Sequence, residues 1–184
     1  TERNIISRFQ RIYMSSHEPE SSLPPLCYID YKLNMDRLHN EIERLKKDEN
    51  IEVVYVDSVQ MIDEPIDMLS KTQYIVNALW KMSREFDIPI IALSSLSRRP
   101  EYAGGDKKPL LSDLRETSAI EMYADTVLLL YRPIYYGLKY DDEGNLIMDT
   151  AQIIVAKNVN GQLDDVNLLF DHCTGEFVDE ILPF

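Results

Sequence analysis

The sequence contains six glycines, two cysteines, three histidines and no long run of apolar residues. A membrane-spanning helix needs roughly 20 mostly apolar residues, and no stretch approaches that length. Cys27 and Cys173 form neither a C-x-x-C pair nor a zinc-binding spacing, and the histidines show no metal-ligand spacing either. No signal-peptide pattern precedes the first helical pattern. These features predict a cytoplasmic protein with reduced thiols and no membrane partner.

Basic residues are also scarce, with 19 Lys and Arg against 32 Asp and Glu and a formal net charge of −13. Proteins that hold nucleic acid by electrostatics are usually basic on the contacting face. The acidity therefore predicts weak or absent DNA binding by this chain at physiological salt. One segment is locally basic, with Arg98, Arg99, Lys107 and Lys108, and it can be read as a binding loop or as a solvated one.

None of the six glycines is followed by lysine. A phosphate-binding P-loop needs Gly-Lys-Ser/Thr, because backbone N–H groups and one ammonium together hold the phosphates. The sequence therefore predicts that this chain does not hydrolyse a nucleoside triphosphate by itself.

What is present fits one α/β domain, since 184 residues with 45% apolar content can bury a sizeable core. Asn34 is a plausible N-cap for a helix. After it, Met35, Leu38, Ile42 and Leu45 recur at steps of three and four residues, which predicts an amphipathic helix.

Strands and helices then alternate. Ile51–Val56 is an apolar strand, 66–86 a helix with Ile75, Leu79 and Met82 on one stripe, and Ile88–Leu93 a second strand. This order predicts parallel βαβ units. The remaining expected elements are a helix over 4–14, a strand over 26–29, a polar and mobile loop over 94–111, a helix over 114–123 capped by Ser112, and strands over 126–131, 151–156, 166–170 and 177–178, the last three antiparallel.

The candidate chemistry lies where the two expected parallel strands end. Asp57 follows the first strand, and Ser94 and Ser95 follow the second. Ligands of open parallel sheets bind beyond the carboxyl ends of the strands. A carboxylate there suits Mg²⁺, which takes few protein oxygens and keeps several waters. Alternatively, Asp57 ends its strand by bonding to the following loop, and the serines form a hydroxyl-rich turn.

One long motif carries a family resemblance. Asp106–Arg132 reads D-K-K-P-L-L-S-D-L-R-E-T-S-A-I-E-M-Y-A-D-T-V-L-L-L-Y-R. It resembles the DnaB-type replicative helicases, whose pattern is D-K-R-P, then S-D-L-R-E-S-G-S-I-E-Q-D-A-D, then an apolar strand and Y-R. Three further segments are similar to the same family: Val53–Met61, Ile88–Arg98 and Ile153–Gly161.

The resemblance covers nearly the whole chain and implies one partial DnaB-like C-terminal domain over residues 1–184. The implied fold is a RecA-like sheet with helices on both faces. Its strands would be mainly parallel with antiparallel C-terminal strands, and the first strand and P-loop would be missing. For the family it implies ATP-driven unwinding of duplex DNA in replication by a ring of six subunits, with ATP and Mg²⁺ as cofactors.

The resemblance also implies roles for individual residues. Asp57 would be the magnesium carboxylate once a P-loop is supplied. Gln60 and Ser95 would lie at the nucleotide site, and Lys157 would reach the γ-phosphate of a neighbouring subunit. The matching D-L-R-E segment would place Arg115 and Glu116 at the DNA.

Three positions depart from the family pattern. Val159 stands where K-x-R-N-G has its arginine finger, Ser95 where the family has a γ-phosphate-sensing Gln, and Ser118 where it has a small Gly. Arginine fingers contribute about 10³–10⁵ in rate in related phosphoryl transfers. The P-loop and the catalytic glutamate are likewise not found in this chain.

These departures leave two readings open. The first is a helicase domain that is catalytically impaired as this chain, with ATP and Mg²⁺ not expected to bind to it alone. The second is a non-enzymatic helicase paralogue that acts as a protein-interaction partner. The expected partners are further copies of the chain or other helicase and replication subunits.

Overall fold

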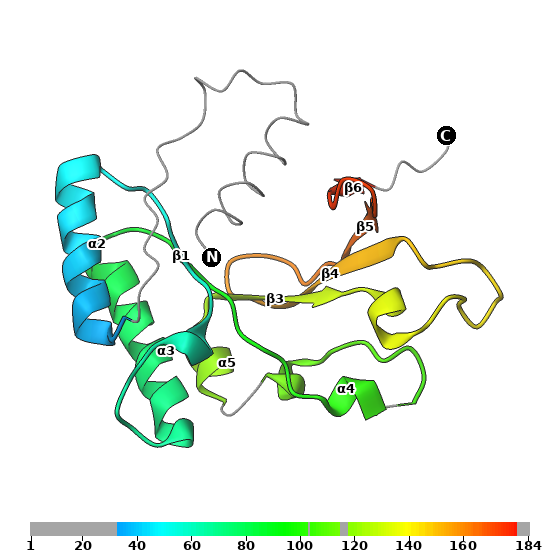
Figure 1. Cartoon of the computed structure of the whole chain (residues 1–184), viewed down its shortest axis with the longest axis horizontal. Coiled ribbons are helices and arrows are strands. Elements are labelled where there is room, and N and C mark those ends of the chain that lie inside the picture. The colour runs from blue at the N-terminus through cyan, green and yellow to red at the C-terminus, as the bar shows by residue number, and fades with distance from the viewer. Residues whose placement is uncertain (1–32, 103, 115–117, 180–184) are drawn as a thin grey trace.

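The computed structural model describes residues 33–102, 104–114 and 118–179 (Figure 1). The helix expected over 4–14, the strand expected over 26–29, and Arg115 and Glu116 lie outside these residues.

The first described element is helix α2 (Met35–Glu49), which begins where the sequence predicts. The side chain of Asn34 accepts a hydrogen bond from the Arg37 backbone N–H at 2.9 Å and so caps the helix. The stripe predicted from the spacing is the buried face of the helix: Met35, Leu38, Ile42 and Leu45.

A βαβ unit follows, as expected, with β1 (Val54–Val56), the 3₁₀ turn η2 (Val59–Met61), α3 (Met68–Glu85) and β2 (Ile90–Ala92). Strands β1 and β2 pair in parallel, with Val54 opposite Ile90 and Val56 opposite Ala92. Helices α2 and α3 pack together against this pair and enclose one apolar core. Its most buried members include Met35, Val59 and Ile75.

The chain between β2 and the next strand contains a short helix α4 (Arg99–Tyr102), a 3₁₀ turn η3 (Leu111–Asp113) and helix α5 (Ala119–Tyr123). The prediction of a helix from Leu114 capped by Ser112 is wrong. Leu114 is extended and forms an antiparallel bridge with Leu96, while Ser112 lies within η3. Helix α5 begins only at Ala119, where Ser118 occupies the N-cap position without a side-chain cap.

The C-terminal part is a four-stranded antiparallel sheet in the order β3-β4-β5-β6. Its elements are β3 (Thr126–Tyr131), β4 (Thr150–Asn158), β5 (Val166–Phe170) and β6 (Phe177–Asp179), with the turn η4 (Pro133–Tyr136) after β3. The predicted antiparallel pairing of the last three strands is confirmed.

The expected α/β class with a parallel and an antiparallel part is therefore confirmed, but two details differ. The described strands form two separate sheets with one parallel pairing and three antiparallel ones, so the sheet is not mainly parallel in this part of the chain. Helices cover the face of β1–β2 that carries Val54 and Val56, whereas Tyr55 and Ile91 on the opposite face are exposed. Within the described residues, β2 pairs only with β1 and β3 pairs only with β4, so the two sheets are not joined.

None of the helices in the described ranges combines the length and apolar character that crossing a membrane would require.

Candidate nucleotide site

The structure brings together polar residues at the carboxyl ends of β1 and β2. Gln60 donates from Nε2 to the Ser94 hydroxyl at 2.9 Å and accepts from the Ser95 backbone N–H at 3.3 Å. Backbone hydrogen bonds between Leu93 and Val56 and between Val59 and Leu93 hold the same two strand ends. Gln60 thus uses both halves of its amide to fix the turn after β1 against the turn after β2.

Asp57 lies at this edge as well, directly after the buried Val56 at the end of β1. Its side chain is exposed, and within the described part of the chain no donor binds its carboxylate. The alternative that Asp57 ends the strand by bonding to the following loop is therefore not what the structure shows. A free carboxylate with room for waters is the kind of ligand that Mg²⁺ takes from proteins.

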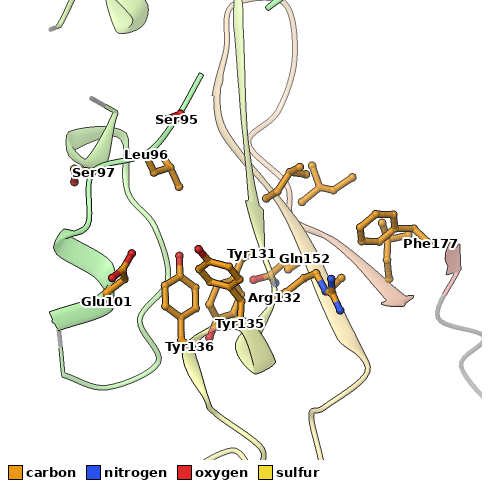
Figure 2. A pocket seen from close by; sticks show the side chains of 14 residues that line it. Ser95, Leu96, Ser97, Glu101, Tyr131, Arg132, Tyr135, Tyr136, Gln152 and Phe177 are labelled. Atoms are coloured by element: carbon orange, nitrogen blue, oxygen red, sulfur yellow. The ribbon is translucent and has the colours of Figure 1, made fainter. Parts of the chain in front are cut away.

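A cavity of about 540 Å³ borders Ser95 and extends between the segment after β2 and the antiparallel sheet. Figure 2 shows Ser95, Leu96 and Ser97 on one side of it, with the tyrosines at and after the end of β3 on the other. The cavity therefore lies at the ends of β2 and β3, each of which has one edge that no described strand pairs with.

Aromatic rings form much of the cavity wall. Tyr131 and Tyr136 stack with ring centroids 5.9 Å apart, and Tyr135 meets Tyr136 edge-on at 5.2 Å. Burial, followed by the negative charge of Asp106, raises the pKa of Tyr131 to about 12, and burial also raises the pKa of Tyr136. The Tyr131 hydroxyl donates to the Asp106 carbonyl, while Tyr135, at 76% exposure, offers an open ring face.

Two buried polar atoms at this cavity have no hydrogen-bond partner among the described residues: Arg132 Nε and Gln152 Oε1. The Arg132 guanidinium lies 3.5 Å from the centroid of the Phe170 ring, which holds it by a cation–π contact. The Gln152 Nε2 group already donates to Asn167 at 3.0 Å. Both atoms are closed to solvent, so the accessible wall of the cavity is largely aromatic, with Arg132 and Gln152 among its lining residues.

Lys157 does not join this cluster. It lies on β4 opposite Val127, near the start of β3, whereas the cavity lies beyond the end of that strand. Its ammonium donates to the carbonyl oxygens of Glu121 and Ala124, at 2.7 Å each. Lys157 thus caps the C-terminal end of α5, a partnership that its motif spacing does not indicate.

Val159, two residues further on, is 61% exposed, and its backbone N–H donates to Asp125. The position of the arginine in the family pattern therefore carries an apolar side chain, which has no charge to offer a ligand.

The tyrosines and Gln152 were missed as site residues by the sequence analysis. They come from two segments distant in sequence, 131–136 and the one that contains Gln152, and no short motif joins those segments. One local signal is present, because three tyrosines fall within the six residues 131–136 at the end of a predicted strand.

Comparison with known proteins agrees with the geometry. Residues 8–179 match the family described as the DnaB-like helicase C terminal domain. The chain is 35% identical over 167 residues to a probable replicative DNA helicase from Trieres chinensis, covering 88% of this chain and 36% of the relative. It is 34% identical over 160 residues to the replicative DNA helicase DnaB of Rickettsia felis, covering 79% of this chain and 32% of that protein.

Two solved structures share the fold. One, an ATPase domain, has a TM-score of 0.71 at 32% identity, covering 81% of this chain and 52% of that one. A DnaB-like replicative helicase, studied together with its interactions with primase, has a TM-score of 0.73 at 31% identity, covering 83% and 36%. The chain spans about a third of the length of the curated relatives it matches. With the family match over most of its length, this chain belongs to the DnaB-like helicase C-terminal domain family.

Proposed function

We propose that this chain serves DNA replication as part of an ATP-dependent, DnaB-like helicase. It would carry the magnesium-binding residue of a nucleotide site. The observation that supports the proposal is the cluster of Asp57, Gln60 and Ser95 at adjoining strand ends, beside an aromatic cavity. Family membership supports the same role, because the relatives are replicative helicases.

The residues present fit ATP and Mg²⁺. Asp57 would hold a magnesium-bound water, and the metal would neutralise charge that develops on the phosphates. Gln60 and Ser95 would orient the phosphate end of the site. The rings of Tyr135 and Tyr136 would receive the base, because a planar ring stacks on aromatic faces.

The groups that bind the phosphates would come from a segment outside this sequence, because none of the glycines in this sequence is followed by lysine. Among the described residues, β2 and β3 each have one edge without a partner strand, which supports this part of the proposal. A strand inserted between them would join the two sheets, and its carboxyl end would open directly onto the cavity. A P-loop after that strand would face Asp57 and Ser95.

By the family resemblance, Lys157 would act on the nucleotide of a neighbouring copy rather than its own. Its ammonium would then have to leave the carbonyl oxygens of Glu121 and Ala124, to which it donates in this structure. Arg115 and Glu116 would face DNA in the channel of such a ring. The chain would work in the cytoplasm with replication subunits as partners.

Val159 favours a second candidate, a non-enzymatic paralogue that binds other proteins. An exposed apolar side chain at the arginine-finger position would leave a neighbour's phosphates unpaired. On this reading the fold is kept and catalysis is lost.

Nucleotide binding tests the proposal. A strand and loop that carry Gly-x-x-x-x-Gly-Lys-Ser/Thr are joined ahead of Thr1, and a fluorescent ATP analogue is titrated with and without Mg²⁺. We expect Mg²⁺ to strengthen binding, and Asp57→Asn to remove that gain. Asp142→Asn, in an exposed turn, is the matched control and should leave it unchanged. Failure of the extended chain to bind the analogue would contradict the first candidate and favour the second.

A further inference from the structure

A buried carboxylate, Asp113, lies at the base of the segment that joins β2 to α5. Its side chain is 1% exposed, and both of its oxygens are engaged. Oδ1 accepts from Arg99 Nε at 2.7 Å, and Oδ2 accepts from the Leu110 backbone N–H at 2.8 Å. A buried charge is tolerated only when it is paired and hydrogen-bonded, so these contacts define the position of the Arg99 side chain.

The two members of this ion pair differ sharply in exposure. Arg99 is 60% exposed, although its partner is almost fully buried. Only Nε of the guanidinium binds Asp113, and among the described residues the Arg99 side chain has no other acceptor. The two terminal nitrogens therefore face solvent with their orientation already set. A planar guanidinium held in this way is suited to the oxygens of a phosphate.

The segment that carries Arg99 is tied down rather than loose. The Asp113 backbone accepts from Ser97 at 2.7 Å and donates to Leu110 at 2.9 Å, which closes the segment at its base. Near its tip, the Tyr131 hydroxyl donates to the Asp106 carbonyl. The sequence analysis expected a mobile loop because no apolar stripe docks it. Mobility itself stays a prediction, but polar contacts hold the segment at its base and near its tip.

We propose that Arg99 binds a backbone phosphate of nucleic acid and that Asp113 is its positioning residue. The proposal rests on the proposed function, because Arg115 follows Asp113 by two residues and is the DNA-facing residue by resemblance. Arg98, Lys107 and Lys108 lie on the same closed segment, which also carries Glu101 and Asp106. With the Arg99–Asp113 pair neutral, a small excess of positive charge remains for phosphate binding.

The sign of one substitution separates positioning from simple charge. Asp113→Asn removes a negative charge, so long-range electrostatics alone would strengthen DNA binding. Positioning predicts the opposite. The neutral amide has no charge to pair with the guanidinium, and its NH₂ group would face a donor, either the Leu110 N–H or Arg99 Nε, so Arg99 would lose its fixed orientation. We therefore expect Asp113→Asn to weaken binding of labelled single-stranded DNA roughly tenfold, by fluorescence anisotropy at about 50 mM salt.

Three matched variants complete the experiment. Arg99→Lys keeps a cation beside Asp113 but loses the planar pair of terminal N–H groups, so it should weaken binding. The slope of log K against log salt should change little, because the positive charge is kept. Glu101→Gln removes an exposed carboxylate of the same segment and should leave binding equal or tighter. Thermal unfolding of each variant verifies the fold, and where Asp113→Asn fails to fold, Arg99→Lys decides.

The outcomes are distinguishable from those of the proposed function. If Arg115→Ala weakens binding and neither Arg99→Lys nor Asp113→Asn does, this inference is wrong and the DNA role of Arg115 stands. If the two segment variants weaken binding and Arg115→Ala does not, the inference holds without the family site. Tighter binding by Asp113→Asn, equal competition by millimolar inorganic phosphate, or no binding by the unaltered chain at low salt would each overturn it.

Discussion

The parallel pair β1–β2 and the antiparallel sheet β3–β6 differ in how they are buried. Helices α2 and α3 enclose one continuous core with the parallel pair, in which Ile75 is fully buried. The four-stranded sheet leaves most of β5 and β6 exposed and has an open edge at β3, beside exposed Leu128 and Leu130. Figure 1 shows helices α2 and α3 on one side of the molecule and strands β5 and β6 on the other. The first part stabilises itself, whereas the second presents surface for contacts beyond the described residues.

The candidate site divides along the same line. Gln60 and Ser95, which need fixed geometry, lie on strand ends that the core holds. Tyr135 and Val159, which offer open surface, lie on the antiparallel part. The difference indicates that one part positions chemistry and the other receives ligands or neighbouring subunits.

The largest effect on stability should follow from a cavity in the core. Ile75→Ala should lower the free energy of unfolding by about 3 kcal/mol, because a fully buried side chain loses its contacts. Leu130→Ala on the antiparallel sheet, where the side chain is 62% exposed, should cost less than about 1 kcal/mol. Urea unfolding monitored by circular dichroism measures both. Equal costs would remove the contrast between the two parts.

The next effect concerns the tie between the two strand ends. Gln60→Ala should cost about 1–2 kcal/mol, because the Ser94 hydroxyl and the Ser95 N–H each lose their partner. Gln73→Ala, on the exposed face of α3, is the control and should change stability by less than about 0.5 kcal/mol. A Gln60 variant as stable as this control would show that the strand ends are not held by the amide.

Lys157 tests the same idea on the antiparallel part. Lys157→Met should lower stability by about 1 kcal/mol, since the carbonyl oxygens of Glu121 and Ala124 lose their donor. Lys81→Met, an exposed lysine on α3, serves as the comparison in the same chemical denaturation series. No difference between the two variants would mean that Lys157 does not hold α5 in solution.

The smallest effect is a dependence on pH at the cavity. The pKa of Tyr131 is raised from 10.0 to about 12, first by burial and then by Asp106. Between these values the folded state keeps a proton that the unfolded state releases, so this contribution to stability is complete below pH 10 and is lost as the pH rises toward 12. Tyr131→Phe should flatten that part of the stability curve. A slope unchanged by the substitution would exclude Tyr131 as its source.

Local patterns predicted much of this fold. The Asn34 cap and its apolar stripe gave α2, and runs of β-branched and aliphatic residues gave β3 and β5 at their observed bounds. The start of α5 was wrong, because the bridge from Leu114 to Leu96 is a contact between distant residues that overrides local helix propensity.

The site was predictable only where a motif is contiguous or strands are neighbours. Asp57, Gln60 and Ser95 follow two consecutive strands, so parallel pairing brought them together. The aromatic cavity and the Arg99–Asp113 pair required the path of the whole chain. Lys157 matched a motif, yet its capping of α5 depends on how the sheet places β4, which spacing does not reveal.

Phosphate release from ATP tests the central claim most directly. The claim is that this chain supplies the magnesium-binding carboxylate of a nucleotide site, and that the P-loop that binds the phosphates lies elsewhere. The chain alone should release no phosphate above background, because none of its glycines is followed by lysine. The chain extended ahead of Thr1 by a P-loop segment should release phosphate, and Asp57→Ala should reduce that rate by roughly 10³ or more, since a bound metal ion supplies several kcal/mol of transition-state stabilisation. Phosphate release by the chain alone that Asp57→Ala abolishes, or an active extended chain indifferent to Asp57→Ala, would contradict the account.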